Sequence, residues 1–170
     1  ARESAHVEAR ESAHVEARGS AHVEASSYVA VHQHSDAATI TGGVCIKVPK
    51  LTTPREWCAF YGVTIRDEMA ILYKAVGDDY RSPHGVFYTP GTMPEAPDWD
   101  GGLAECGGGL HFTAHPMMAK ISFAPEATRF VACPIALADI VVHPQPRYPF
   151  KVKARRVAAP IYEVDQSGHP

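Results

Sequence analysis

The chain opens with three near-copies of one octapeptide. Residues 1–8 read ARESAHVE, residues 9–16 repeat them identically, and residues 17–24 carry glycine at position 19 in place of Glu. A period of eight is too short for a helical repeat and is typical of one strand followed by one tight turn. Residues 25–48 keep the frame with decaying identity. The repeat therefore predicts a β-solenoid over residues 1–48, with two octads, and so two strands, in each coil.

Alternation within an octad separates an inner from an outer strand face. Small or apolar residues occupy the fifth and seventh positions, whereas His and Glu fall on the opposite face. Arg10-Glu11, Gly19 and Gly43 are expected at corners. Two octads per coil would stack equivalent residues about 4.8 Å apart, in rows of His, Glu and Arg. The residues expected to form the interior and to carry assembly are Ala5, Val7, Ala13, Val15, Ala21 and Val23.

The array begins in phase at Ala1 without an initiator Met, which predicts that a longer array, or the array of another copy, precedes it. At its uncapped end, the unpaired backbone N–H and C=O groups of the last strand are expected to pair with another chain. A row of His6, His14 and His22 would titrate together at about pH 6 and loosen the array by repulsion. Neighbouring Glu side chains oppose that effect, so a solvated strand face is the preferred interpretation.

Composition gives no electrostatic reason to expect a nucleic-acid partner, because 170 residues with 45% apolar content carry a net charge of −3. Lys151, Lys153 and Arg155 alternate along a strand, and a solvated face is expected for them. The sequence shows neither a signal peptide nor an apolar run of membrane-spanning length. A cytoplasmic or phage-associated protein with no membrane partner is expected, with reduced thiols at Cys45, Cys58, Cys106 and Cys133.

The composition changes after the repeats. We expect a linker and short helix over residues 49–66, followed by a small mixed α+β domain over residues 67–170 that caps the last coil. Thr53-Pro54 with Glu56 predicts a helix over residues 54–61 that ends at Gly62. A further helix or turn is expected at residues 116–123 and a surface loop at 92–109. Strands are predicted at residues 69–76, 85–89, 110–113, 129–135, 150–157 and 161–164.

Pro134 interrupts the fourth of these strands, so it is expected at a sheet edge or a bulge.

The stretch from Cys106 to His111 encloses three consecutive glycines. Glycines allow positive φ and a close approach of backbone to a ligand, and His111 would lie just inside the next strand. A bulged turn beside a buried His111 is the structural alternative. A Cys106 nucleophile with His111 as its base is a chemical alternative. A metal site would use Cys106, His111 and His115, with Cys133 or His143, but this spacing matches no common zinc pattern, so none is expected.

Several short motifs resemble an uncharacterised domain family of phages and bacteria, whose members are often joined to short-period repeats. The resemblance covers about residues 69–158, and Thr113 departs from it because a second cysteine often follows the histidine there. It implies an architecture and no established activity. The motifs are Leu72-Tyr-Lys-Ala-Val76, Tyr88 with Gly91, Cys106-x-x-Gly109-Leu-His111, and Lys153-Ala154.

A second resemblance is to ADP-ribosyltransferase-like folds. It rests on the order of Gly109-Leu-His-Phe-Thr-Ala114, Ala119 and Phe130–Cys133. The resemblance implies a nicotinamide pocket with NAD as the cofactor, formed by Tyr73, Tyr88 and His111, with Glu163 as the candidate acid.

Two functional hypotheses follow. The first is a non-enzymatic structural, assembly or interaction protein, a solenoid rod with a globular cap that forms homo-oligomers through its repeats and needs no cofactor. The alternative is an NAD-dependent ADP-ribosyltransferase-like enzyme or effector displayed on the repeats. The near-identical octads and the lack of an identifiable acidic catalyst favour the first.

Overall fold

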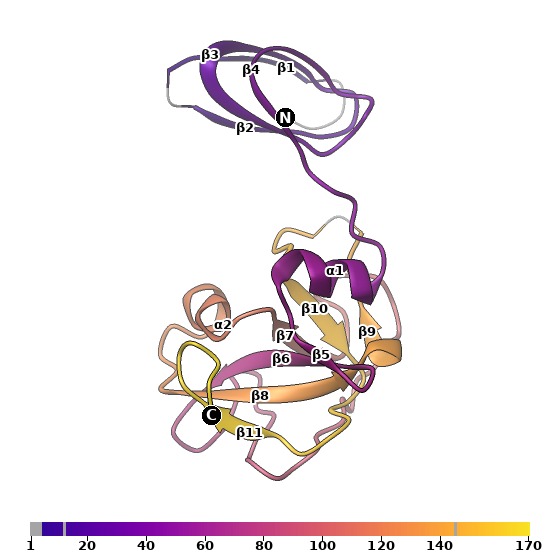
Figure 1. Ribbon diagram of the computed structural model, residues 1–170, viewed down its shortest axis with the longest axis vertical. Helices are drawn as coiled ribbons and strands as arrows, with labels where there is room; N and C mark the ends of the chain where they lie inside the picture. Colours follow the sequence, from indigo (N-terminus) through magenta and orange to yellow (C-terminus); the bar gives the residue numbers. More distant parts are fainter. Residues whose placement is uncertain (1–4, 12, 145) are drawn as a thin grey trace. The chain divides into compact units, whose positions relative to one another are not determined.

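A computed structural model describes residues 5–11, 13–144 and 146–170, and Figure 1 traces them. The chain divides into two compact units, Ala1–Lys50 and Leu51–Pro170.

The first unit is a four-stranded parallel sheet. Its strands are β1 (His6–Ala9), β2 (His14–Ala17), β3 (His22–Gln33) and β4 (Thr39–Lys47). The twelve-residue β3 pairs with β1 along its first part and with β2 along its last part. β4 pairs with both parts of β3. The central strand therefore holds the unit together.

The predicted β-solenoid is wrong, because this sheet is neither closed nor curled into a solenoid. The physical reason lies in the fourth octad. Glu11 and Gly19, at the third position of their octads, turn the chain with φ of 59° each. Ser27 holds the same position but stays inside β3, so the strand continues where a corner was expected. A register shift against β4 between Ala25 and Ala30 accommodates the continuous strand. The prediction that residues 67–170 cap the last solenoid coil is wrong for the same reason, because the repeats form no coil.

The pairing of equivalent residues sixteen positions apart is confirmed. His6 pairs with His22 and Val7 with Val23 in a parallel register. Small and β-branched side chains fill the interior of the unit, as alternation predicts. Ala21 is buried, and the other buried apolar residues form one cluster of Ala9, Val15, Ala17, Val23, Val29, Val31 and Ala38.

The second unit contains two eight-residue helices, α1 (Pro54–Tyr61) and α2 (Pro116–Phe123), and both predicted ranges are confirmed. Thr53 accepts a hydrogen bond from the Glu56 backbone N–H, and the Glu56 side chain accepts one from the Thr53 backbone, which forms a capping box. Gly62 ends α1 in the left-handed conformation with φ of 66°. In Figure 1 both helices lie above the long strands of the sheet.

The sheet of this unit has seven strands in the order β11-β8-β6-β7-β10-β9, with β5 paired to β6. All of its pairings are antiparallel. A short 3-10 helix, η1 (Leu137–Asp139), follows β8. The strands are β5 (Ile65–Arg66), β6 (Met69–Val76), β7 (Leu110–Thr113), β8 (Arg129–Ala136), β9 (Ile140–Val141), β10 (Lys151–Ala154) and β11 (Tyr162–Val164).

Two strand predictions need comment. The expected strand at residues 85–89 is wrong, since only an isolated bridge between Arg81 and Phe87 forms there. Pro134 pairs with Ile71 of β6 and lies beyond the part of β8 that β11 covers. On that side the Pro134 carbonyl oxygen accepts a hydrogen bond from Ala158 N–H at 2.9 Å. Pro134 therefore has no second strand partner there, but it is buried and does not lie at a free edge.

The expected solvated strand face holds for Arg155, which is exposed, and is wrong for Lys151 and Lys153 of β10. Lys151 and Lys153 are 7% and 0% exposed. Acidic side chains from the loop at residues 92–109 pair with both lysines. Lys151 Nζ lies 3.6 Å from Glu105 Oε1, and Lys153 Nζ lies 2.5 Å from Asp100 Oδ1. Buried ammonium groups need such partners. The two pairs fasten the loop at residues 92–109 to the sheet.

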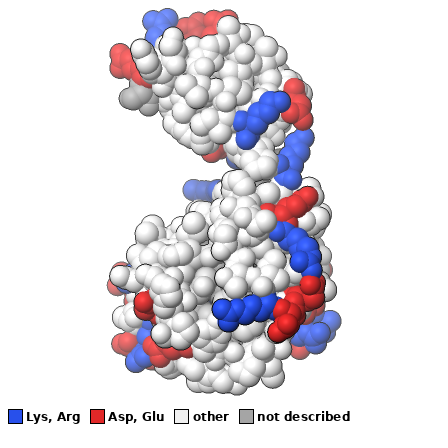
Figure 2. Space-filling view, viewed as in Figure 1, with Lys and Arg blue, Asp and Glu red and all other residues white. Residues whose placement is uncertain are grey.

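No helix in the described part of the chain is long and apolar enough to cross a membrane. On the face shown in Figure 2, positive and negative side chains lie next to one another, with uncharged surface between them.

Candidate functional site

A cavity of about 480 Å³ lies within the second unit. β6 and β7 contribute one wall and α2 a second, while residues 82–88, residues 97–109 and Lys151 of β10 complete the lining. The volume falls in the range of small-molecule sites, about 300–1,000 Å³. Apolar and aromatic side chains form much of its lining. The polar side chains that border it are Lys74, Ser82, His84, Asp98, His111, Thr113 and Lys151.

Lys74 presents a primary amine to this cavity. Its Nζ donates a 2.7 Å hydrogen bond to the backbone oxygen of His111. The same nitrogen lies 5.3 Å from the ring centre of Tyr88 and 5.9 Å from that of Phe112. No ion pair to Lys74 is found among the described residues. The ammonium group is therefore stabilised by one carbonyl oxygen and by the faces of two aromatic rings.

Burial lowers the pKa of Lys74 to about 8, and the positive charge of Lys151 adds to this effect. The side chain remains partly exposed because it borders the cavity. A substantial fraction of this amine is consequently unprotonated at mildly alkaline pH. A neutral, reachable amine is a nucleophile, which an ordinary surface lysine is not at that pH.

His111 lies beside Lys74 and is held neutral. Burial, together with the nearby charges of Lys151 and Lys74, lowers its pKa to about 4. Its Nε2 atom is buried and has no hydrogen-bond partner within the described residues. An unsatisfied buried ring nitrogen is unusual in folded proteins and calls for an explanation such as a ligand or an ordered water.

Aromatic side chains shape the cavity wall. The Tyr88 and Phe112 rings meet edge to face with centres 6.1 Å apart. Tyr88 is 1% exposed, and burial raises the pKa of its phenol, so the group stays protonated. The wall therefore suits a flat or apolar ligand body and leaves the polar chemistry to Lys74 and His111.

The three glycines fit tightly against the protein's own backbone. A Cβ on Gly108 would lie 1.7 Å from the Asp98 carbonyl oxygen. Gly108 N–H donates to Asp100 Oδ2 at 2.8 Å, and Gly109 N–H donates to Asp98 Oδ1 at 3.1 Å. Of the three, only Gly109 has a positive φ, 139°. The close approach that the sequence predicted thus involves the loop at residues 98–100.

The structure brings together four of the five predicted site residues. Tyr73, Tyr88, Cys106 and His111 all line the cavity. Glu163 lies outside this lining, on β11, where its carboxylate accepts hydrogen bonds from Tyr80 Oη at 2.8 Å and Arg129 Nη1 at 2.8 Å.

The residues considered for a metal site each have a different structural environment. His115 caps α2, because its Nδ1 accepts a hydrogen bond from Met117 N–H at 3.3 Å. His143 Nδ1 lies 3.1 Å from the Leu103 backbone oxygen. Cys106 is an exposed free thiol, whereas Cys133 is a buried one. The clusters of possible metal ligands found among the described residues are both in the first unit.

The sequence analysis did not identify Lys74 as a site residue, although the alternation of apolar residues around it indicates an inward-facing lysine. Leu72, Lys74 and Val76 alternate on one strand face, and the two apolar members are 0% and 1% exposed. A lysine between two core positions is expected to face the interior and to have a shifted pKa.

The expected assembly residues lie largely in the interior of the first unit. Val15, Ala21 and Val23 are buried, and Val7 and Ala13 pack against the same cluster. Ala5 precedes β1, and its backbone oxygen accepts a hydrogen bond from His22 N–H at 2.9 Å. Any contact between copies must therefore use other atoms of this unit.

No model of a protein family matches the chain, and neither the curated proteins nor the solved structures contain a significant match to it. The resemblance of residues 69–158 to a phage and bacterial domain family stays a prediction.

Proposed function

We propose that the second unit binds a small aldehyde or ketone with an apolar or aromatic body, and that Lys74 captures it as an imine. One observation carries the proposal: an amine without an ionic partner among the described residues faces a cavity of ligand size. Buried lysines with lowered pKa values are the usual amines for this chemistry.

The step balances without a further reactant. The unprotonated Lys74 nitrogen adds to the carbonyl carbon, a C–N bond forms, and the carbonyl oxygen takes up the proton that the nitrogen releases. The resulting carbinolamine loses water to give the imine. His111 supplies a neutral imidazole in the same cavity, and it is the candidate group for moving the proton between nitrogen and oxygen.

Reductive trapping tests the proposal on the full chain. Pyridoxal 5′-phosphate, an aromatic aldehyde, serves as the probe, and borohydride reduces any imine to a stable amine. The expected result is one adduct per chain at low probe excess, mapped by peptide mass spectrometry to Lys74. Formation should accelerate as the pH rises towards about 8, where the amine loses its proton.

Matched variants separate Lys74 from the other lysines. Lys74→Arg keeps the positive charge and cannot form an imine, so it should lose the adduct. Lys120→Arg, on α2 and outside the cavity lining, should keep it. Adducts spread equally over all lysines, or an unchanged adduct in Lys74→Arg, would refute the proposal. Calorimetry with NAD on the same samples tests the nicotinamide alternative, for which Tyr73, Tyr88 and His111 share the cavity but Glu163 does not.

Self-association through the first unit is a second candidate function, and the sheet edges favour it. Among the described residues, β1 and β2 pair only with β3, and β4 pairs only with β3. All four strands run parallel, so the outer edge of β4 in one copy fits the β1 and β2 edges of the next in the same direction. Such a head-to-tail contact is heterologous and builds open assemblies. Val44 and Ile46 of β4 are 54% and 43% exposed and would lie beside the side chains of the neighbouring strand in the next copy.

Light scattering and negative-stain microscopy of the full chain at micromolar concentration test this candidate. Multimers are expected for the parent chain. Ile46→Lys places a charge on the β4 edge strand and should give monomers. Tyr28→Ser changes a side chain that is 91% exposed on β3 and should leave the multimers intact. A monomeric parent chain would exclude this function.

We further propose a cytoplasmic or phage-associated location, which the four free thiols support because such cysteines persist in reducing surroundings.

A further inference from the structure

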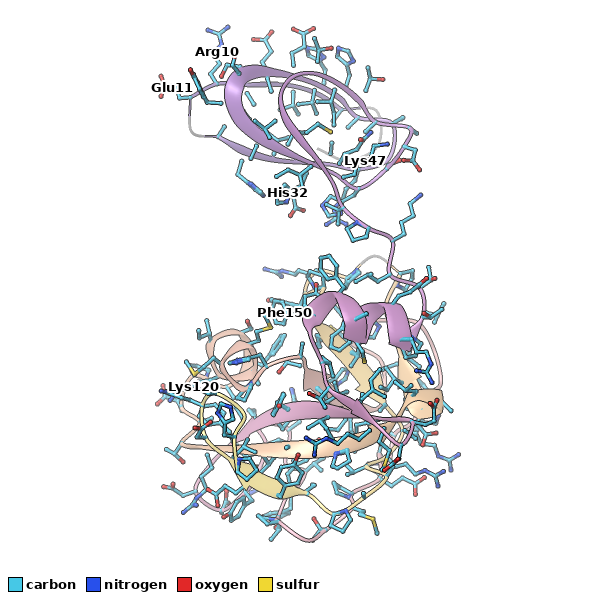
Figure 3. All side chains as sticks on the ribbon, viewed as in Figure 1. Arg10, Glu11, His32, Lys47, Lys120 and Phe150 are labelled. Carbon is cyan, nitrogen blue, oxygen red and sulfur yellow. The ribbon has the colours of Figure 1, made fainter. Side chains whose placement is uncertain are left out.

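The repeat creates a second type of site on the outer face of the first unit. Each of the first three octads carries His-Val-Glu, so that His and Glu point to the same side of their strand. Parallel pairing then sets Glu16 of β2 directly beside His32 of β3. His14 precedes Glu16 by two residues on the same face. Figure 3 labels His32 on the first unit.

Three possible ligand atoms converge there. One ring nitrogen each from His14 and His32 and one carboxylate oxygen of Glu16 all lie within 4.8 Å of one another. The two rings meet edge to face with centres 4.5 Å apart. Ligands of a tetrahedral zinc ion lie about 3.4 Å apart, given bonds of about 2.0–2.1 Å. Rotation of exposed side chains is sufficient to close that difference.

A fourth group lies beside Glu16. His34 Nε2 lies 3.7 Å from Glu16 Oε2 and is buried without a hydrogen-bond partner within the described residues. Burial and the charge of Arg18 lower the pKa of His34. A neutral imidazole with an unsatisfied nitrogen is the form in which histidine binds a metal.

We propose that His14, Glu16 and His32, with His34 as a further ligand, bind one divalent transition ion of the zinc class. Two or three imidazoles and a carboxylate suit Zn²⁺ in charge and ligand type, whereas Mg²⁺ and Ca²⁺ prefer oxygen ligands alone. The ion would join β2 to β3 through their side chains. It would also compete with Arg18, whose Nη2 lies 3.0 Å from Glu16 Oε2.

The other histidine cluster provides an internal comparison. His6, Glu8 and Glu24 also lie within 4.8 Å of one another, but they offer one imidazole and two carboxylates. Zinc should therefore prefer the cluster of His14 and His32, because imidazole suits this class of ion better than carboxylate does.

Calorimetry with ZnCl₂ on the full chain, purified without a histidine tag, tests the proposal, and Co²⁺ absorption reports the ligand geometry. One tight site per chain is expected. His32→Gln should weaken binding at least tenfold, whereas the matched His22→Gln should leave it unchanged. Arg18→Gln removes the competing cation and should tighten binding.

Unchanged affinity in His32→Gln would overturn the proposal, and so would loss of binding in His6→Gln but not in His32→Gln. Circular dichroism of each variant confirms that the sheet has formed. The Arg18→Gln result adds a gain of affinity that misfolding does not produce, so weaker binding in that variant would also count against the site.

Discussion

Gly108→Ala tests whether the glycine loop is fixed by its own backbone. A Cβ at this position would lie 1.7 Å from the Asp98 carbonyl oxygen and 2.8 Å from its carbonyl carbon. Ordinary contact begins at 3.4 Å, so one segment must move by about 1.7 Å. The obstacle is backbone, which rotamer changes do not relieve. Overpacking of this kind costs about 1–3 kcal/mol, and we expect the upper half of that range.

Urea unfolding followed by tryptophan fluorescence measures this cost. Both tryptophans, Trp57 and Trp99, belong to the second unit, so the signal reports on that unit. With a slope of about 1–3 kcal/mol per molar urea, the midpoint should fall by roughly 1 M. The control is Gly102→Ala in the same loop, where the nearest atom to an added Cβ is 3.6 Å away. Equal midpoints for the two variants would refute the reasoning.

Three further changes have predicted directions. His111 has a folded pKa of about 4 against 6.5, so the stability that it contributes is present above pH 6.5 and is lost as the pH falls to about 4. His111→Gln should therefore lose less unfolding free energy than the parent over that interval in urea titrations. Lys74 has a folded pKa of about 8 against 10.5, so the parent should gain stability from pH 8 to 10.5 because the unfolded chain there holds the extra proton. Lys74→Met should lack this gain, and an identical slope in both proteins would contradict the buried amine. Thr53→Ala removes the α1 cap and should cost about 1 kcal/mol of unfolding free energy, with an unchanged urea midpoint as the contrary outcome.

Features encoded by adjacent residues were predictable. The ranges of α1, α2, β6 and β7 follow from caps, glycines and alternation, which depend only on neighbours in sequence. The pairing of residues sixteen apart in the first unit was also predictable, because near-identical octads impose it.

Features that depend on distant partners were not predictable. The repeat signal could not show that Ser27 would stay extended, so that β3 continues through the position where a corner was expected. Burial of Lys151 and Lys153 required Glu105 and Asp100 from a loop with no regular pattern. Sheet order likewise decides that Glu163 lies on β11, away from the β7 wall of the cavity.

The pKa of Lys74 in solution tests the central claim most directly. Lysine labelled with ¹³C at Cε gives one NMR signal for each of the six lysines, and Lys74→Arg identifies the relevant one by its loss. We expect this signal to titrate at about pH 8 and to shift when the aldehyde probe is added and reduced. A signal that titrates together with exposed lysines, at about 10.4, and ignores the probe would contradict it.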